Sequence, residues 1–458
     1  MTAAAERVAP ALLAATVVVV ALGSSSVDAL ASLGRGGRWP ALFLLAAVAA
    51  LLAVRRGSLL DAAREPLYIA AGGFVGLAAL SVVWTVDPAL TAQRAISLGT
   101  LVLAAAGLGW AARGRPHIAG RLLLGLLAGA AAVAAAGLVV LELSFDDAVQ
   151  AATVQTPLRY RGLGENPNTV SMLVAIATPL ALWAAMTAAR GRERTFGLAS
   201  LLLFYGSIVF SGSRGALLAA FVGSLVVVLG TAPTVSLRLR HAGVAAAFFV
   251  LGVGLSQLPL PSAPPTVVAV ETTPTSTEPG PHPSPGTATP EKVPPSELPL
   301  GSLTDEVGRP TTVSGRTLFA SSGRLRAWRA AIAQGNSRPL LGFGFGTEDV
   351  VFVDRVYTFQ SRRPENSLIG MYLQLGLAGV ALLLAIAAVG LTSAVRAARG
   401  GLAGRGVALA VTGVVVAGVV IALVQSYVYA AGNIGTLTVW TCLFLLTVAA
   451  PSSSRRSE

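Results

Sequence analysis

Residues 324–346 read RLRAWRAAIAQGNSRPLLGFGFG, and residues 362–376 read RRPENSLIGMYLQLG. The first stretch is rich in arginine and carries aromatic side chains and closely spaced glycines. The second leads into an apolar run that begins near Glu365 or Ser367. Because an apolar helix of about 20 residues can cross the hydrocarbon core of a membrane, these stretches predict a polar segment joined directly to a membrane helix.

The composition of the whole chain is that of a membrane protein. Of its 458 residues, 54% are hydrophobic and only 12% are charged, and the mean hydropathy is +0.72. This is too apolar for a soluble globular protein. The net charge of +12 does not indicate nucleic-acid binding, because the basic residues lie in short clusters between apolar runs. The single cysteine, Cys442, cannot form an intrachain disulfide.

The apolar runs predict an all-α, polytopic membrane protein with about twelve transmembrane helices. The first run is also compatible with a signal peptide, because Arg7 precedes it and Ala29-Leu30-Ala31 resembles a cleavage site, but a retained anchor is preferred. The spans are expected near residues 8–23, 40–54, 67–86, 97–112, 120–141, 168–189, 197–212, 215–231, 242–260, 367–391, 406–429 and 433–449.

The distribution of arginine predicts the orientation of these spans. Loops that face the cytoplasm carry an excess of Lys and Arg, which here places both termini in the cytoplasm and the protein in the plasma (inner) membrane. The cytoplasmic group includes Arg55, Arg56, Arg64, Arg113 and Arg115. Some arginines fall on the outer side, against the rule, and require another explanation: Arg35, Arg38, Arg94, Arg159, Arg161 and Arg214.

One large external loop is expected between the ninth and tenth helices. Residues 261–310 are dense in Pro, Thr and Ser and predict a disordered insertion. The following residues 311–366 predict an ordered loop with short amphipathic helices, in which Leu325, Trp328 and Ile332 share one side. The predicted organisation is therefore 1–260 (nine membrane helices), 261–310, 311–366, 367–450 (three membrane helices) and 451–458 (cytoplasmic tail).

Four motifs together resemble the O-antigen ligase and O-antigen polymerase family. In that family a Pro-Asn pair precedes a membrane helix, and Ser-Arg-Gly lies at the outer end of another. Arg followed by Trp opens the large external loop, and His-Asn closes it before a helix that ends in a Leu-Gly turn. The matching pieces are GENPNTVSMLVAIATPLALW (164–183), SGSRGALLA (211–219), GRLRAWRAAI (323–332) followed by PLLGFGFG (339–346), and ENSLIGMYLQLGLAG (365–379).

The resemblance implies a helical, C-type glycosyltransferase that moves a glycan from a polyprenyl diphosphate (undecaprenyl diphosphate) to a sugar or lipid acceptor at the outer face. It implies a reaction without a cofactor, a divalent metal or a nucleic acid. Membrane lipids are the expected surroundings of the protein. Negative charge grows on the diphosphate as the glycosidic bond breaks, and arginine suits this charge. Arg214 and Arg324 match the motif arginines of the family, and Arg159 and Arg161 are expected as further substrate contacts.

The acceptor hydroxyl must also lose a proton to a base. The family commonly has His at the position where this chain has Glu365, which predicts a carboxylate base, a different acceptor, or loss of transfer. Placed in the first turn of a helix beside Arg362 and Arg363, Glu365 is expected to be ionised. The histidines fall in predicted cytoplasmic loops or in the insertion: His117, His241 and His282.

Other residues of the motifs have two interpretations. Asn168 and Asn366 begin predicted helices, so each is a capping residue or a substrate contact. Trp328 packs at the membrane interface or stacks on a sugar. The glycines of the GFGFG segment are expected in turns, because no strand and no Lys-Ser or Lys-Thr pair accompanies them. They are Gly342, Gly344 and Gly346.

Two functions other than glycan transfer remain open from the sequence. A transporter or flippase for an anionic solute or lipid-linked glycan is the main alternative, and it requires ionisable groups at the bilayer midplane. The predicted spans carry almost none, which favours chemistry at the membrane surface. The third interpretation is a non-catalytic assembly factor, because Glu365 stands where the family commonly has His. The sequence does not separate a ligase from a polymerase.

Overall fold

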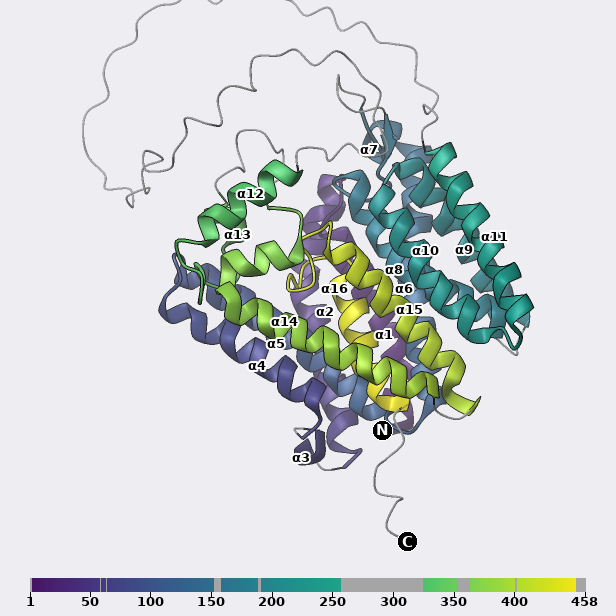
Figure 1. Ribbon diagram of the computed structural model, residues 1–458, viewed down its shortest axis with the longest axis horizontal. Helices are drawn as coiled ribbons and strands as arrows, with labels where there is room; N and C mark the ends of the chain where they lie inside the picture. Colours follow the sequence, from purple (N-terminus) through teal and green to yellow (C-terminus); the bar gives the residue numbers. More distant parts are fainter. Residues whose placement is uncertain are drawn as a thin grey trace, which may run out of the picture.

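The computed structural model describes residues 2–57, 59–62, 64–151, 158–187, 191–256, 324–352, 363–399 and 402–449. These residues form a bundle of helices with two short strands, β1 (Val149–Gln150) and β2 (Arg159–Tyr160), paired antiparallel (Figure 1). The helices are α1 (Thr2–Leu22), α2 (Asp28–Val54), α3 (Leu59–Ala62), α4 (Pro66–Leu80), η1 (Ser81–Val83), α5 (Pro88–Ala112), α6 (Pro116–Leu143), α7 (Phe145–Ala148), α8 (Pro167–Thr187), α9 (Gly191–Ser211), α10 (Arg214–Thr231), α11 (Val235–Leu255), α12 (Arg324–Gly335), α13 (Glu348–Val351), α14 (Ser367–Arg399), α15 (Leu402–Ala422), α16 (Thr436–Leu445) and η5 (Leu446–Ala449). The all-α, polytopic class is confirmed.

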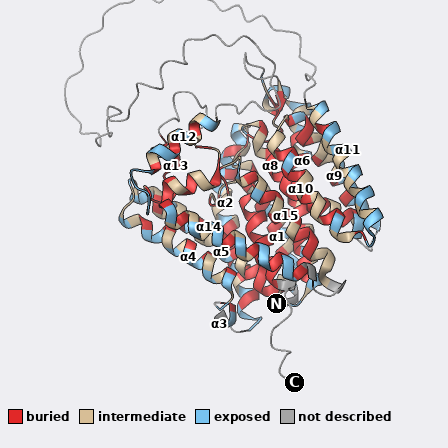
Figure 2. Cartoon of the chain, in the orientation of Figure 1, coloured by how far each residue is buried: buried red, intermediate tan, exposed pale blue. Residues whose placement is uncertain are grey.

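Eleven helices in the described part of the chain are long and apolar enough to cross a membrane, and they coincide with eleven of the predicted spans. The twelfth, expected near 433–449, is the shorter α16 followed by η5. All ten residues of α16 are buried, so other helices surround it. Figure 2 shows the buried residues concentrated in the middle of the bundle, whereas α11 at its edge buries only Gly252.

Local sequence signals start several of these helices. Proline occupies the first position of α4, α5, α6 and α8, where its missing N–H costs no helical hydrogen bond. Asp87 caps α5 by accepting a hydrogen bond from the backbone nitrogen of Leu90 at 3.0 Å. The apolar composition then carries each helix across the bundle.

Two helices begin nine or more residues earlier than hydropathy predicts. α2 begins at Asp28 rather than near residue 40, and α5 begins at Pro88 rather than near residue 97. Both extensions contain arginines that were expected in loops. Arg38 on α2 and Arg94 on α5 line a polar cavity, whereas Arg35 is exposed. The boundary prediction is wrong here because a polar cavity inside the bundle accommodates charges that a lipid-facing helix would exclude.

The arginines form two groups at opposite ends of the bundle. At the end that holds the first residues of α1 and α3, Arg115 pairs with Glu6 at 2.8 Å, and Arg56 donates to the carbonyl oxygen of Arg113 at 2.6 Å (Figure 1). The helices α7, α12 and α13 lie at the other end. The arginines predicted as cytoplasmic are thus separated from those predicted as external.

Helix α14 is interrupted at Gly376, whose φ of 59° and ψ of −154° are not helical. The segment before α13 binds this break: the backbone nitrogens of Phe343 and Gly344 donate to the carbonyl oxygens of Leu373 and Gln374 at 2.9 and 2.8 Å. These bonds satisfy backbone groups that an interrupted membrane helix would otherwise leave unpaired. The expected Leu-Gly turn is therefore present, and Gly342, Gly344 and Gly346 have the positive φ expected of turn glycines.

The predicted insertion 261–310 lies outside the described residues, as do residues 311–323 and 353–362 of the external loop and the tail 451–458.

Candidate functional site

Arg214 is the first residue of α10 and follows a tight turn at the end of α9. The buried Arg159, 7% exposed, holds this turn: its Nε donates to the carbonyl oxygen of Ser211 at 2.6 Å. Its Nη2 donates to Oδ1 of Asn168 on α8 at 3.2 Å. Arg159, on β2, therefore joins α8 to the end of α9 and fixes the backbone that precedes Arg214.

Arg324 is the first residue of α12, which packs on α14. The indole nitrogen of Trp328 donates to the carbonyl oxygen of Pro364 at 2.7 Å, so α12 is bound to the residue that precedes Glu365. In the part of the chain that the structure describes, Nε of Arg324 is buried without a hydrogen-bond partner. A buried guanidinium N–H of this kind is a donor available to an anionic ligand.

The face of α12 that packs on the protein is formed by small residues. Ala327, Ala331 and Gly335 are buried, whereas Leu325 and Ile332 are 53% and 42% exposed. The side that carries Leu325 and Ile332 is therefore not the one that packs on the rest of the protein. Small residues take this place because α12 approaches α14 closely: a Cβ at Gly335 would lie 2.6 Å from the Tyr372 ring.

Glu365 has a φ of 55°, the one positive φ of a non-glycine residue among those described. Such a conformation costs free energy and is often retained at functional sites. Glu365 lies just before α14 rather than in its first turn, because Asn366 is the capping residue. Oδ1 of Asn366 accepts from the backbone nitrogens of Leu368 and Ile369 at 2.9 and 3.1 Å. Arg362, expected beside Glu365, lies outside the described residues.

The charges of Arg214 and Glu365 both act on Arg324, so the three residues lie near one another. Burial lowers the pKa of the Arg324 guanidinium, the Glu365 carboxylate raises it, and Arg214 lowers it further. Arginine titrates so far above neutral pH that Arg324 remains a cation. The structure therefore brings together, from α10, α12 and the start of α14, the residues that the motifs predict as catalytic.

The remaining predicted residues mainly contact the protein backbone. Arg161 donates through Nε and Nη2 to the carbonyl oxygens of Asp147 and Asp146, each at 2.9 Å, and so binds α7. Nδ2 of Asn366 donates to the carbonyl oxygen of Leu423 at 2.9 Å. These bonds hold the loops at this end of the bundle in place.

The capping prediction holds for Asn366 and is wrong for Asn168. Asn166 caps α8, since its Oδ1 accepts from the backbone nitrogen of Asn168 at 2.9 Å. Asn168 lies one position inside the helix, where its side chain accepts from Arg159. The Pro167 that opens α8 shifts the cap to the preceding asparagine.

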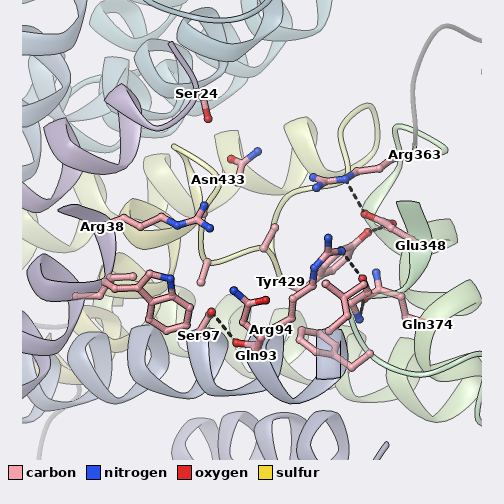
Figure 3. Close-up of a pocket in the computed structure, with 18 of the residues that line it drawn as sticks. Ser24, Arg38, Gln93, Arg94, Ser97, Glu348, Arg363, Gln374, Tyr429 and Asn433 are labelled. Carbon is pink, nitrogen blue, oxygen red and sulfur yellow. Dashed lines mark hydrogen bonds and ion pairs between the residues drawn. The ribbon is translucent and has the colours of Figure 1, made fainter. Parts of the chain in front are cut away.

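A polar cavity of 330 Å³ lies beside this cluster, between α2, α5, α14 and the α15–α16 connection (Figure 3). Arg94 on its wall forms a two-pronged ion pair with Asp349, at 2.7 and 2.8 Å, and donates to the carbonyl oxygen of Gly346. Arg363 lies 3.6 Å from Glu348, whose other oxygen accepts from the Tyr429 hydroxyl at 2.6 Å. These contacts fasten α13 to α5 and to the start of α14.

The ionisable groups of this network are shifted by burial and by one another. Burial raises the pKa of Glu348 to about 6, although Arg363 and Tyr429 oppose the change. Burial also raises the pKa of Asp349, but its bonds to Arg94 outweigh this and hold that pKa below its ordinary value. For Arg363 burial lowers the pKa, and the carboxylates of Glu348 and Asp349 raise it overall. Arg363 also experiences the charge of Glu365, so the cavity adjoins the Arg324 cluster.

Sequence reasoning did not identify Glu348, Asp349 or Tyr429 as site residues. It did flag Arg38 and Arg94 as arginines on the unexpected side of the membrane, and that was the available signal. Within the described ranges, no group of three or more His, Cys, Asp or Glu side chains is arranged to hold a metal ion.

The fold and site define a multi-pass membrane protein with an arginine-rich polar site at one end of its helix bundle. Residues 198–384 match the family model described as O-Antigen ligase. The match includes Arg214, Arg324 and Glu365 and three of the four motifs, while GENPNTVSMLVAIATPLALW (164–183) lies before it. It confirms the resemblance and supports the O-antigen ligase and polymerase family. That family implies a membrane glycosyltransferase of polysaccharide biosynthesis that uses lipid-linked glycans. No curated protein matches the chain.

Proposed function

We propose that this protein transfers a glycan from a polyprenyl-diphosphate carrier to a sugar acceptor at the outer face of the plasma membrane. Arg214 and Arg324 bind the diphosphate, and Glu365 is the base. The observation that carries the proposal is the proximity of these residues, together with the buried Nε of Arg324. Two cations near one carboxylate suit a reaction in which a diphosphate leaves and a hydroxyl loses its proton.

The reaction forms a bond between the acceptor oxygen and the anomeric carbon of the donor sugar. The bond from that carbon to the diphosphate oxygen breaks, and its electron pair leaves with the diphosphate. The guanidinium groups of Arg214 and Arg324 stabilise this growing negative charge without a divalent metal. The proton of the acceptor hydroxyl passes to the carboxylate of Glu365.

Buried contacts around these residues would keep them in position during the reaction. Arg159 fixes the turn before Arg214, and the bond from Trp328 to the Pro364 carbonyl fixes α12 against the residue before Glu365. Such fixed positions lower the reorganisation needed when charge develops. Arg159 is proposed as a positioning residue, because its own guanidinium is held by Ser211 and Asn168.

The test uses the full-length protein in lipid nanodiscs with a polyprenyl-diphosphate-linked oligosaccharide and a sugar acceptor. Arg214→Ala and Arg324→Ala should each lower kcat about 100-fold or more, because each removes a charged donor to the leaving group. Arg329→Ala is the matched control, since it removes an exposed arginine from the same helix as Arg324 and should retain activity. Normal turnover by both Arg214→Ala and Arg324→Ala would refute the assignment.

The base is tested by two replacements of Glu365. Glu365→Ala should lower kcat by about 100-fold or more, since general base catalysis contributes at least this much. Glu365→His introduces the residue common in the family and should restore transfer, with the pH profile of an imidazole. Equal activity of the Ala and His variants would show that no base acts at this position. Transfer should persist in the presence of a chelator, and its loss would contradict a metal-independent reaction.

A further inference from the structure

The polar cavity contains one cation that the ion-pair network does not use. Arg94 is neutralised by Asp349, and Arg363 lies between Glu348 and Asp349. Arg38 forms no hydrogen bond or ion pair with any residue that the structure describes. Its side chain extends from α2 into the cavity, across from Arg363 (Figure 3). Glu165 also lines the cavity, but its side chain is exposed.

The charged neighbours of Arg38 are themselves arginines. The fields that act on its guanidinium come from Arg35 and Arg94. A half-buried cation among like charges is unfavourable unless an anion approaches it. The backbone of Gly432 lies beside its guanidinium, because a Cβ at Gly432 would lie 2.8 Å from Nη1 of Arg38. The protein therefore holds a guanidinium toward the cavity without supplying a carboxylate for it.

The rest of the cavity wall suits a polyhydroxylated ring. Hydroxyl and amide side chains line it and offer both donors and acceptors. Trp39, which stacks on Phe43 with ring centroids 5.7 Å apart, adds an aromatic surface against which the apolar face of a sugar can pack. The volume of 330 Å³ is at the lower end of the ~300–1,000 Å³ of small-molecule sites. Neutral polar residues of the lining include Ser24, Gln93, Ser97, Gln374 and Asn433.

The cavity adjoins the proposed reaction centre. Arg363 on its wall lies two positions before Glu365 and experiences the charge of that residue. A sugar in the cavity would thus lie on the side of the proposed base, which must reach the attacking hydroxyl. The donor diphosphate would occupy the separate Arg214 and Arg324 cluster, neither of which lines the cavity.

We propose that the cavity binds the acceptor sugar and that Arg38 recognises an acidic group on it, either a carboxylate or a phosphate. The proposal rests on the glycan-transfer function and adds a substrate class to it: acceptors that end in an acidic sugar. Arg38 binds the anion, Trp39 packs on the ring, and the polar side chains bind its hydroxyl groups.

The test measures equilibrium binding to the full-length protein in nanodiscs without donor. The probes are a disaccharide ending in glucuronic acid, one ending in glucose 6-phosphate, and a neutral one ending in glucose. At least one acidic probe should bind about tenfold or more tightly than the neutral one, since a charge-assisted hydrogen bond is gained. The acidic probe that binds more tightly shows whether the site prefers a carboxylate or a phosphate.

Arg38→Gln should lower the affinity for the acidic probe by about tenfold or more and leave the affinity for the neutral probe unchanged. Trp39→Ala should weaken both probes. Arg35→Gln is the matched control, because it removes the same charge from an exposed position on the same helix and should weaken binding of the acidic probe far less than Arg38→Gln does. Equal effects of Arg35→Gln and Arg38→Gln, or equal binding of acidic and neutral probes, would overturn the proposal.

A final measurement separates this proposal from the proposed function. Undecaprenyl diphosphate should bind Arg38→Gln as tightly as the wild type and bind Arg214→Ala more weakly. Weaker binding to Arg38→Gln would place the donor in the cavity and overturn the acceptor assignment. If acidic sugars bind through Arg38 while Arg214→Ala and Arg324→Ala transfer glycan normally, the cavity assignment stands and the catalytic assignment fails.

Discussion

Glu348 should make the stability of the protein depend on pH near 6. Its side chain is buried, and its pKa in the folded protein is about 6, against an ordinary value of 4.5. The folded state then binds this proton more tightly than the unfolded state does. The stabilisation is present in full below pH 4.5 and is lost as the pH rises through 6. At ~1.4 kcal/mol for each tenfold change in proton affinity, the loss is about 2 kcal/mol.

Glu348→Gln removes this titration while keeping an oxygen that accepts from the Tyr429 hydroxyl. The variant should gain about 2 kcal/mol over the wild type as the pH rises from 4.5 to 7.5. The free energy of unfolding of both full-length proteins is measured by denaturant titration in mixed micelles at intervals across this range. Because other carboxyl groups titrate in both proteins, the difference between the two curves isolates Glu348.

The matched control is Glu165→Gln, which removes an exposed carboxylate from the wall of the same cavity. The loss of stability assigned to Glu348 should persist in this variant as the pH rises. If the difference between Glu348→Gln and the wild type stays constant from pH 4.5 to 7.5, the burial argument is refuted. A constant offset alone would report a change in packing rather than in protonation.

Three further substitutions test the local structure. Gly346→Ala should lower the free energy of unfolding by more than about 1 kcal/mol, because φ of Gly346 is 81° and a Cβ there would lie 2.4 Å from the Arg94 side chain. The control Gly36→Ala, in open space on α2, should be tolerated. Trp328→Phe loses the bond to the Pro364 carbonyl and should lower kcat more than it raises KM, as steady-state kinetics would show. Asn366→Ala removes the α14 cap and should cost about 1 kcal/mol in the free energy of unfolding, and an unchanged value would contradict the capping role.

Hydropathy and motifs predicted much of this protein because both are local in sequence. A run of about 20 apolar residues specifies a membrane helix whatever its neighbours are, so eleven of the twelve predicted spans agree with the structure. The motif residues Arg214, Arg324 and Glu365 were each recognisable beside a helix start. The family resemblance predicted that these residues lie close together, but only the tertiary structure shows it.

The tertiary structure alone decided how the charges are paired. Arg94 and Asp349 are 255 residues apart in the chain, and only the packing of α13 against α5 makes them partners. The helices around the cavity leave Arg38 among other arginines. The packing of α12 on α14 buries Ala327 and Ala331 in preference to larger apolar residues. Ion pairs and close helix contacts depend on distances between distant segments, whereas membrane insertion depends on the composition of each segment alone.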